Sequence, residues 1–178
     1  MTSLRERAVN LVLYQAGWLG CVVGAGHGQP LAGATAALAV VMVHLSLATR
    51  PLRSALTVMA AAVVGVVFES ALVLAGWVVY PGRSLAIGLA PLWMVTLWAA
   101  FATTLDNSLA WMQQRHSVAA LFGAVGGPLS YWAGERLGAL RLEQPLPALL
   151  AIAAGWAIAT PLLLELARRV QGTRRGAA

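Results

Sequence analysis

The chain has 178 residues, of which 60% are hydrophobic and only 10% are charged. Soluble domains carry about 25% charged residues, so this chain has too few charges to cover a water-facing surface. The net charge is +6, but the basic residues are all arginines between apolar segments or near the chain ends, without the interleaved basic and aromatic residues that bind nucleic acid. We therefore expect an integral membrane protein and no nucleic-acid partner.

Six apolar segments approach the length of about 20 residues that a membrane-spanning helix needs. They cover residues 8–25, 31–49, 54–79, 87–112, 117–133 and 146–166. Short connections that contain Pro, Gly and Arg separate them. The sequence predicts an all-α membrane protein in which residues 1–178 form one domain, a compact bundle of six transmembrane helices.

The first segment follows Arg5 and Arg7, as the apolar part of a signal peptide would. No small-x-small cleavage site followed by a polar region comes after it, because the next apolar segment begins at once. We therefore expect a retained helix.

The arginines predict the orientation, since six spans place both termini on one side. Nine arginines fall on that side, namely Arg5, Arg7, Arg50, Arg53, Arg115, Arg168, Arg169, Arg174 and Arg175. The opposite side receives Arg83, Arg136 and Arg141. By the positive-inside rule both termini lie in the cytoplasm, and Trp77 and Tyr80 fall at the outer membrane interface.

Polar side chains inside a bilayer are costly, so a group of them suggests a site. The densest group falls in the cytoplasmic half and comprises Asn10, Tyr14, Gln15, His44, Thr103, Asp106 and Asn107. A His–Asp contact is the unit of an acid–base pair, so we take His44 as the candidate base and Asp106 as its orienting partner, with the others as binding residues. The alternatives are hydrogen bonds that only fix helix packing, at about 0.6 kcal/mol each, or hydrated groups near the interface.

Glu69 lies inside the third segment, toward its outer half, with no charged neighbour at i±3 or i±4. A carboxyl group there is either protonated or paired with another helix. Tyr131 and Arg136 are the candidate partners by depth. The sequence leaves a binding role and a packing role open.

The fifth segment contains Gly123 and Gly127, a spacing that lets another helix approach closely. We expect this face to contact another membrane protein or a second copy of the chain. Pro128 predicts a kink, which is a common packing feature and is also found at transporter binding sites.

Signs of a cofactor or metal site are missing from the sequence. Cys21 is the single cysteine, which excludes an internal disulfide and a cysteine-based cluster. The chain has no His-Glu-x-x-His, Walker or Gly-x-Ser-x-Gly motif, and its three histidines are a poor zinc or haem set. We predict no metal and no cofactor.

Four sequence blocks carry a resemblance to a known family. They are Asn10…Tyr14-Gln-x-Gly-Trp18, Pro91-Leu-Trp93, Thr103-Thr-Leu-Asp-Asn-Ser-Leu-Ala-Trp111 and Gly123-x-x-Gly-Gly-Pro-Leu-Ser-Tyr131. Over nearly its whole length the chain resembles an uncharacterised bacterial inner-membrane family, known as a domain of unknown function. The resemblance implies the inner membrane of a Gram-negative bacterium and a role near fatty-acyl or membrane-lipid modification, because such genes often neighbour enzymes of that kind. It supplies no reaction and no catalytic residues.

Three functions remain open. The leading one is an accessory protein or enzyme of membrane-lipid or envelope metabolism, whose cytoplasmic-side group handles a lipid head group or a proton. The second is a small transporter or substrate-capturing subunit, similar in size to the vitamin-binding subunits of energy-coupling-factor transporters, in which Glu69, Trp77, Tyr80 and Tyr131 matter most. The third is a structural membrane partner. The position of a cavity distinguishes them.

Overall fold

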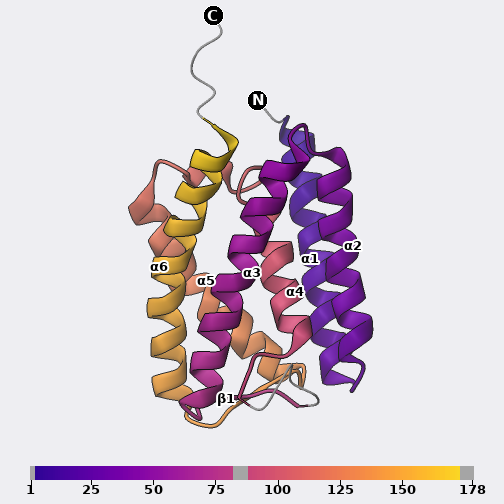
Figure 1. Cartoon of the computed structure of the whole chain (residues 1–178). Coiled ribbons are helices and arrows are strands. Elements are labelled where there is room, and N and C mark those ends of the chain that lie inside the picture. Colours follow the sequence, from indigo (N-terminus) through magenta and orange to yellow (C-terminus); the bar gives the residue numbers. More distant parts are fainter. Residues whose placement is uncertain (1–2, 82–87, 173–178) are drawn as a thin grey trace, which may run out of the picture.

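The computed structural model describes residues 3–81 and 88–172 of the chain (Figure 1). The helices of this part are α1 Leu4–Gly26, α2 Pro30–Leu47, α3 Pro51–Leu74, α4 Leu92–Ala102, α5 His116–Arg136 and α6 Pro145–Gln171, with a short 3₁₀-helix η1 Ala110–Met112. Two short strands, β1 Val78–Val79 and β2 Arg141–Leu142, pair antiparallel. The predicted all-α class is confirmed.

Four of these helices, α1, α2, α3 and α6, are long and apolar enough to cross a membrane. Large apolar side chains cover their outer faces: Val12, Met42, Val67 and Leu162 are each more than half exposed. An apolar exterior of this kind suits lipid rather than water. These helices indicate a membrane protein.

Helix α4 differs from the helix that the sequence predicts over residues 87–112. Residue 87 lies outside the described residues. Helix α4 has 11 residues and ends at Ala102, and turns lead from there to η1. The hydroxyls of Thr103 and Thr104 donate to the carbonyls of Ala100 and Phe101, each at 2.7 Å. The backbone itself changes to the 3₁₀ pattern here, because the N–H groups of Thr103 and Thr104 donate to the same two carbonyls, three residues earlier.

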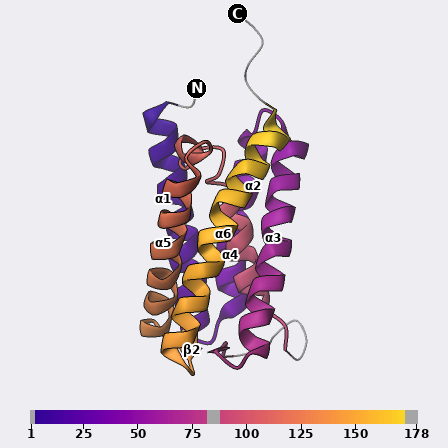
Figure 2. The same ribbon diagram turned by 90° about the vertical axis from the view of Figure 1, so that its left-hand side faces the viewer.

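Helix α4 lies in the middle of the bundle, with nine of its 11 residues buried (Figure 1). Around it, α1 packs on α2, α2 on α3, α3 on α6 and α6 on α5. Figure 2 shows α6 between α5 and α3. The two ends of this series, α1 and α5, leave a groove between them.

Helix α1 begins and α6 ends at the same end of the bundle, which we call the terminal end (Figure 1). The β1–β2 pair lies at the opposite end. It holds the segment that follows α3 against the segment that follows α5, because Val78 pairs with Leu142. Gly76, with φ +68°, allows the chain to turn back after α3.

Candidate functional site

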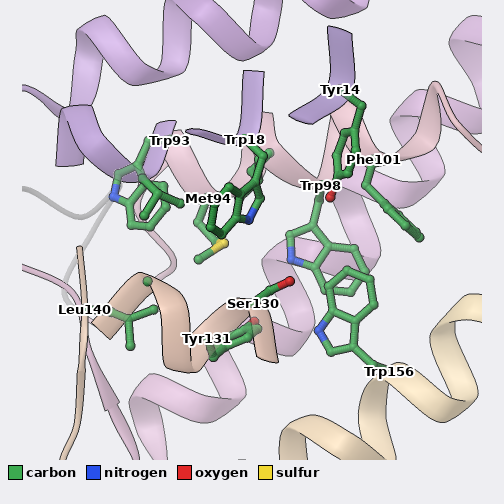
Figure 3. Close-up of a pocket in the computed structure, with 13 residues that line it drawn as sticks. Tyr14, Trp18, Trp93, Met94, Trp98, Phe101, Ser130, Tyr131, Leu140 and Trp156 are labelled. Atoms are coloured by element: carbon green, nitrogen blue, oxygen red, sulfur yellow. The ribbon is translucent and has the colours of Figure 1, made fainter. Parts of the chain in front are cut away.

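An aromatic cavity of about 40 Å³ lies beside α4, on the side that faces α1 and α5 (Figure 3). Its aromatic lining comprises Tyr14, Trp18, Trp93, Trp98, Phe101, Tyr131 and Trp156. The stacked rings of Trp98 and Trp156, 4.4 Å apart between centroids, form one wall. The rings of Tyr14 and Phe101 form a T-shaped pair, with 6.1 Å between their centroids.

A groove of about 290 Å³ between α1 and α5 continues from this cavity. Tyr14, Trp18, Phe101, Ser130 and Trp156 line both the groove and the cavity. The exposed side chains of Leu11, Phe122 and Leu129 form the rim, so the groove opens on the side of the bundle.

Glycines set the positions of the two stacked tryptophans. Gly65 of α3 lies against the Trp98 ring, and Gly127 of α5 lies so close to Trp156 that an added Cβ would be 2.6 Å from its Cγ. The neighbouring Gly126 also lines the groove, and an added Cβ there would meet nothing within 4 Å. The aromatic wall therefore depends on small residues of α3 and α5.

The helix that the Gly123–Gly127 pair admits is α6 of the same chain. Both glycines are buried, and a Cβ added to Gly123 would collide with the backbone carbonyl of Trp156. The close approach that this spacing permits is thus made inside the chain, and contact with another membrane protein or a second copy stays a prediction. Helix α5 runs through Pro128 from His116 to Arg136.

A buried carboxyl group, that of Glu69, lies directly behind the cavity wall. It is 0% exposed. Its Oε1 accepts hydrogen bonds from Trp98 Nε1, at 2.7 Å, and from the Tyr131 hydroxyl, while its Oε2 accepts one from the Tyr80 hydroxyl. Trp98 and Tyr131 also line the cavity, so two of the three donors connect the carboxyl group to it.

Of the two predicted partners of Glu69, Tyr131 is confirmed and Arg136 is not. The Arg136 guanidinium lies over the Trp132 ring instead, at 5.3 Å. The sequence did not indicate Tyr80 as a partner of Glu69, because that contact depends on the chain reversal after α3. The β1–β2 pair and an edge-on contact with Trp93, at 5.7 Å, hold Tyr80 in place.

At the terminal end the structure brings His44 and Asp106 together. His44 Nε2 lies 3.9 Å from Asp106 Oδ1, and Asn107 Nδ2 lies 3.4 Å from His44 Nδ1. Gln171 of α6 donates to Asp106 Oδ2 at 2.9 Å and to Ser54 Oγ at 3.1 Å. His44 and Asp106 line neither the cavity nor the groove described above.

The other predicted binding residues divide between this network and the groove. Asn10 holds the turns after α4, because its Nδ2 donates to the Thr103 carbonyl at 3.0 Å and its Oδ1 accepts from Ser108 Oγ at 2.8 Å. Tyr14 lines the cavity and the groove, and Gln15 is exposed and lines the groove. The group that the sequence suggested as one cluster is thus divided in two.

Arginines fix the end of α6 to the start of α3. Arg50 and Arg53 both donate to the Gln171 carbonyl, at 2.6 and 3.0 Å. They satisfy one of the carbonyls that a helix leaves free at its C-terminus. These bonds hold the end of α6 in place, and the Gln171 side chain connects α6 to the network around Asp106.

The family model described as "Protein of unknown function (DUF2878)" matches residues 7–162. The chain belongs to the DUF2878 family. The resemblance to an uncharacterised family is therefore confirmed. No curated protein and no solved structure matches the chain.

The region matched to the DUF2878 family contains the groove, the aromatic cavity and the Glu69 cluster in full. It also contains His44, Asp106 and the turns after α4, but not Gln171. The polar network at the terminal end is thus completed by a residue beyond the matched region.

Proposed function

We propose that this DUF2878 protein binds a hydrocarbon chain of a membrane lipid in the groove between α1 and α5. On this proposal it acts as an accessory protein or enzyme of membrane-lipid or envelope metabolism in the bacterial inner membrane. The observation that carries the proposal is a groove that opens on the apolar side of the bundle and continues into an aromatic cavity.

The proposal includes six membrane crossings with both termini in the cytoplasm. Helix α5 has 21 residues and packs along α6, one of the four long apolar helices. The described arginines support this orientation. Those at the terminal end are Arg5, Arg7, Arg50, Arg53, Arg115, Arg168 and Arg169, and those at the opposite end are Arg136 and Arg141. An excess of arginine marks the cytoplasmic side.

A hydrocarbon chain is the occupant that the lining favours. In that arrangement the groove faces the acyl chains of the bilayer, and most of its lining residues are apolar or aromatic. Binding sites of this kind are mostly apolar with a few polar groups that orient the ligand. Gln15, Ser130 and the Tyr14 hydroxyl are such groups, and they suit the ester or hydroxyl oxygens of a lipid.

We assign the His44–Asp106 pair to a different role from the lipid site. Neither residue lines the groove or the cavity, and the pair joins α2, the turns after α4 and α6 at the terminal end. In an enzyme, a reaction at His44 would require the lipid head group to approach from that end. The base and orienting roles of His44 and Asp106 stay predictions.

A groove-filling variant tests the proposal. Gly126→Leu places a side chain into open space in the groove, whereas Val125→Leu puts the same side chain on an exposed position of α5 outside the groove. With a phospholipid that carries a diazirine in its acyl chain, we expect cross-links concentrated in the groove-lining parts of α1 and α5. Gly126→Leu should reduce them several-fold and Val125→Leu should not. Cross-links spread evenly over all exposed helices would contradict the proposal.

A transporter or substrate-capturing subunit is the second candidate. The cavity is lined by Tyr131, which bonds Glu69 in the half of the bundle away from the terminal end. Lipid extracts from a deletion strain distinguish the two candidates by mass spectrometry. A lipid change that wild type restores and Gly126→Leu does not would support the lipid role. An unchanged lipid profile would favour the transport candidate and direct the work to uptake assays.

A further inference from the structure

We infer that Glu69 is a proton-binding site, connected to the aromatic cavity through Tyr131 and to the end of the bundle through Tyr80. The proton on Glu69 does not depend on the proposed lipid function. Its exchange with a bound ligand does, because that step requires an occupant of the cavity.

The two carboxyl oxygens of Glu69 are not equivalent. Oε1 accepts from Trp98 Nε1, which can only donate, and also from the Tyr131 hydroxyl. Oε2 has the Tyr80 hydroxyl as its partner, and a hydroxyl can either donate or accept. Oε2 can therefore carry a proton. The protonated oxygen then donates to the Tyr80 oxygen, and the Tyr80 O–H bond rotates away from Glu69.

The surroundings of Glu69 contain no positive charge among the described residues. Within the part of the chain that the structure describes, no ion pair joins it to a basic side chain, and Arg136 lies over Trp132. The titratable groups that face it are Tyr80 and Tyr131. Helix α4 contributes only the Trp98 indole to its partners. The charged residues of α6 lie near the C-terminal end of that helix, at the terminal end of the bundle. A fully buried carboxylate without a counter-ion among the residues at 3–81 and 88–172 is costly in an apolar bundle, and a bound proton removes that cost.

A proton fits this site better than a cationic ligand. Glu69 lines neither the cavity nor the groove, so an organic cation held there would not touch its oxygens. Tyr131 lines the cavity and its hydroxyl bonds Glu69, so this hydroxyl can pass a proton in either direction.

Tyr80 provides the other connection. It follows β1 at the end of the bundle opposite the terminal end (Figure 1). A proton released by a ligand passes to Tyr131, whose own proton moves to Oε1 of Glu69. The proton on Oε2 then moves to Tyr80, whose own proton is released toward the β1 end of the bundle. A half-turn of the carboxyl group returns the remaining proton to the side that faces Tyr80. One proton is transferred in total, Glu69 keeps one, and no electrons move.

Infrared spectroscopy of the full chain in lipid bilayers, with no added ligand, tests the site directly. At neutral pH we expect the carbonyl stretching band of a protonated carboxyl group, which shifts in D₂O because the proton exchanges. Glu69→Gln should abolish the band, and Asp106→Asn should retain it. Tyr131→Phe should keep the band and move its frequency, because Oε1 loses one donor.

Two results would overturn the inference. One is a wild-type spectrum in this region identical to that of Glu69→Gln, which would mean that Glu69 carries no proton. The other is a band that does not shift in D₂O, which would mean that the proton does not exchange. Should Glu69→Gln fail to fold, the frequency shift in Tyr131→Phe decides the assignment, and an unmoved band contradicts it. Because no ligand is present, failure of the lipid cross-linking experiment leaves this test unaffected.

Discussion

At the scale of single residues, the candidate site depends on where glycines allow aromatic rings to lie. Gly65 and Gly127 lie against Trp98 and Trp156, and the stacked pair forms the wall in front of Glu69. The preceding residue, Gly126, faces open space instead. Adjacent glycines of α5 therefore have different roles, one in packing and one in leaving the groove open.

This difference predicts opposite effects of the same substitution. Gly127→Ala should lower the free energy of unfolding by about 1–3 kcal/mol, because the added methyl group collides with the Trp156 ring. Gly126→Ala meets no atom within 4 Å and should be neutral or stabilising by up to about 1 kcal/mol, since Ala favours the helix. Unfolding curves of both variants in the same detergent measure the difference. Equal stabilities would show that Trp156 does not lie against Gly127.

The sequence identified part of the Glu69 cluster and not the rest. Depth along the helices was enough to suggest Tyr131 as a partner, because both residues fall at similar depth in α3 and α5, which run in the same direction. Depth could not indicate Trp98, which depends on the rotation of α4, nor Tyr80, which depends on the turn at Gly76. It also suggested Arg136, whose side chain packs on a ring of its own helix.

At the scale of elements, the segment that follows α4 is the main departure from expectation. Apolar length predicts where a chain can cross a membrane, but it does not show whether the backbone stays helical throughout. Non-helical backbone is tolerated at membrane depth where protein covers it and its polar groups are bonded. Here Thr103–Leu105 is buried, and Asn10 and Gln113 donate to the carbonyls of Thr103 and Leu105. The polar residues that suggested a site thus serve in part to satisfy the backbone.

Asn10 should accordingly control the local stability of this segment. Asn10→Ala removes the bonds to the Thr103 carbonyl and to Ser108, so we expect amide hydrogen exchange of residues 103–109 to become about tenfold faster. Gln15→Ala, at an exposed position on the same helix, is the matched control and should leave that exchange unchanged. Hydrogen-exchange mass spectrometry in detergent or bilayers reads out both variants. Equal exchange in the two variants would contradict the role of Asn10.

At the scale of the whole molecule, the groove follows from the order in which helices pack. The sequence indicates which residues are apolar, but in a membrane protein both the interior and the lipid-facing surface are apolar, so hydrophobicity does not show which helices are neighbours. The central position of α4 and the separation of α1 from α5 could not be predicted for this reason. The all-helical class and four long apolar helices could be predicted, since these depend on length and hydropathy alone, whereas the count of six crossings stays a prediction.

The position of the groove within the membrane depends on whether α5 crosses it, and cysteine labelling tests this. The native Cys21 is buried, so wild type provides an unlabelled background. Gln114→Cys and Leu137→Cys place thiols at exposed positions next to the two ends of α5. In spheroplasts, a membrane-impermeant maleimide should label Leu137→Cys directly and Gln114→Cys only after permeabilisation, because the proposed orientation puts the arginine-rich end in the cytoplasm. Labelling of both from outside would mean that α5 does not cross and that the groove does not face acyl chains. The reverse pattern would keep the groove in the bilayer but place Tyr80 and the Glu69 proton path on the cytoplasmic side.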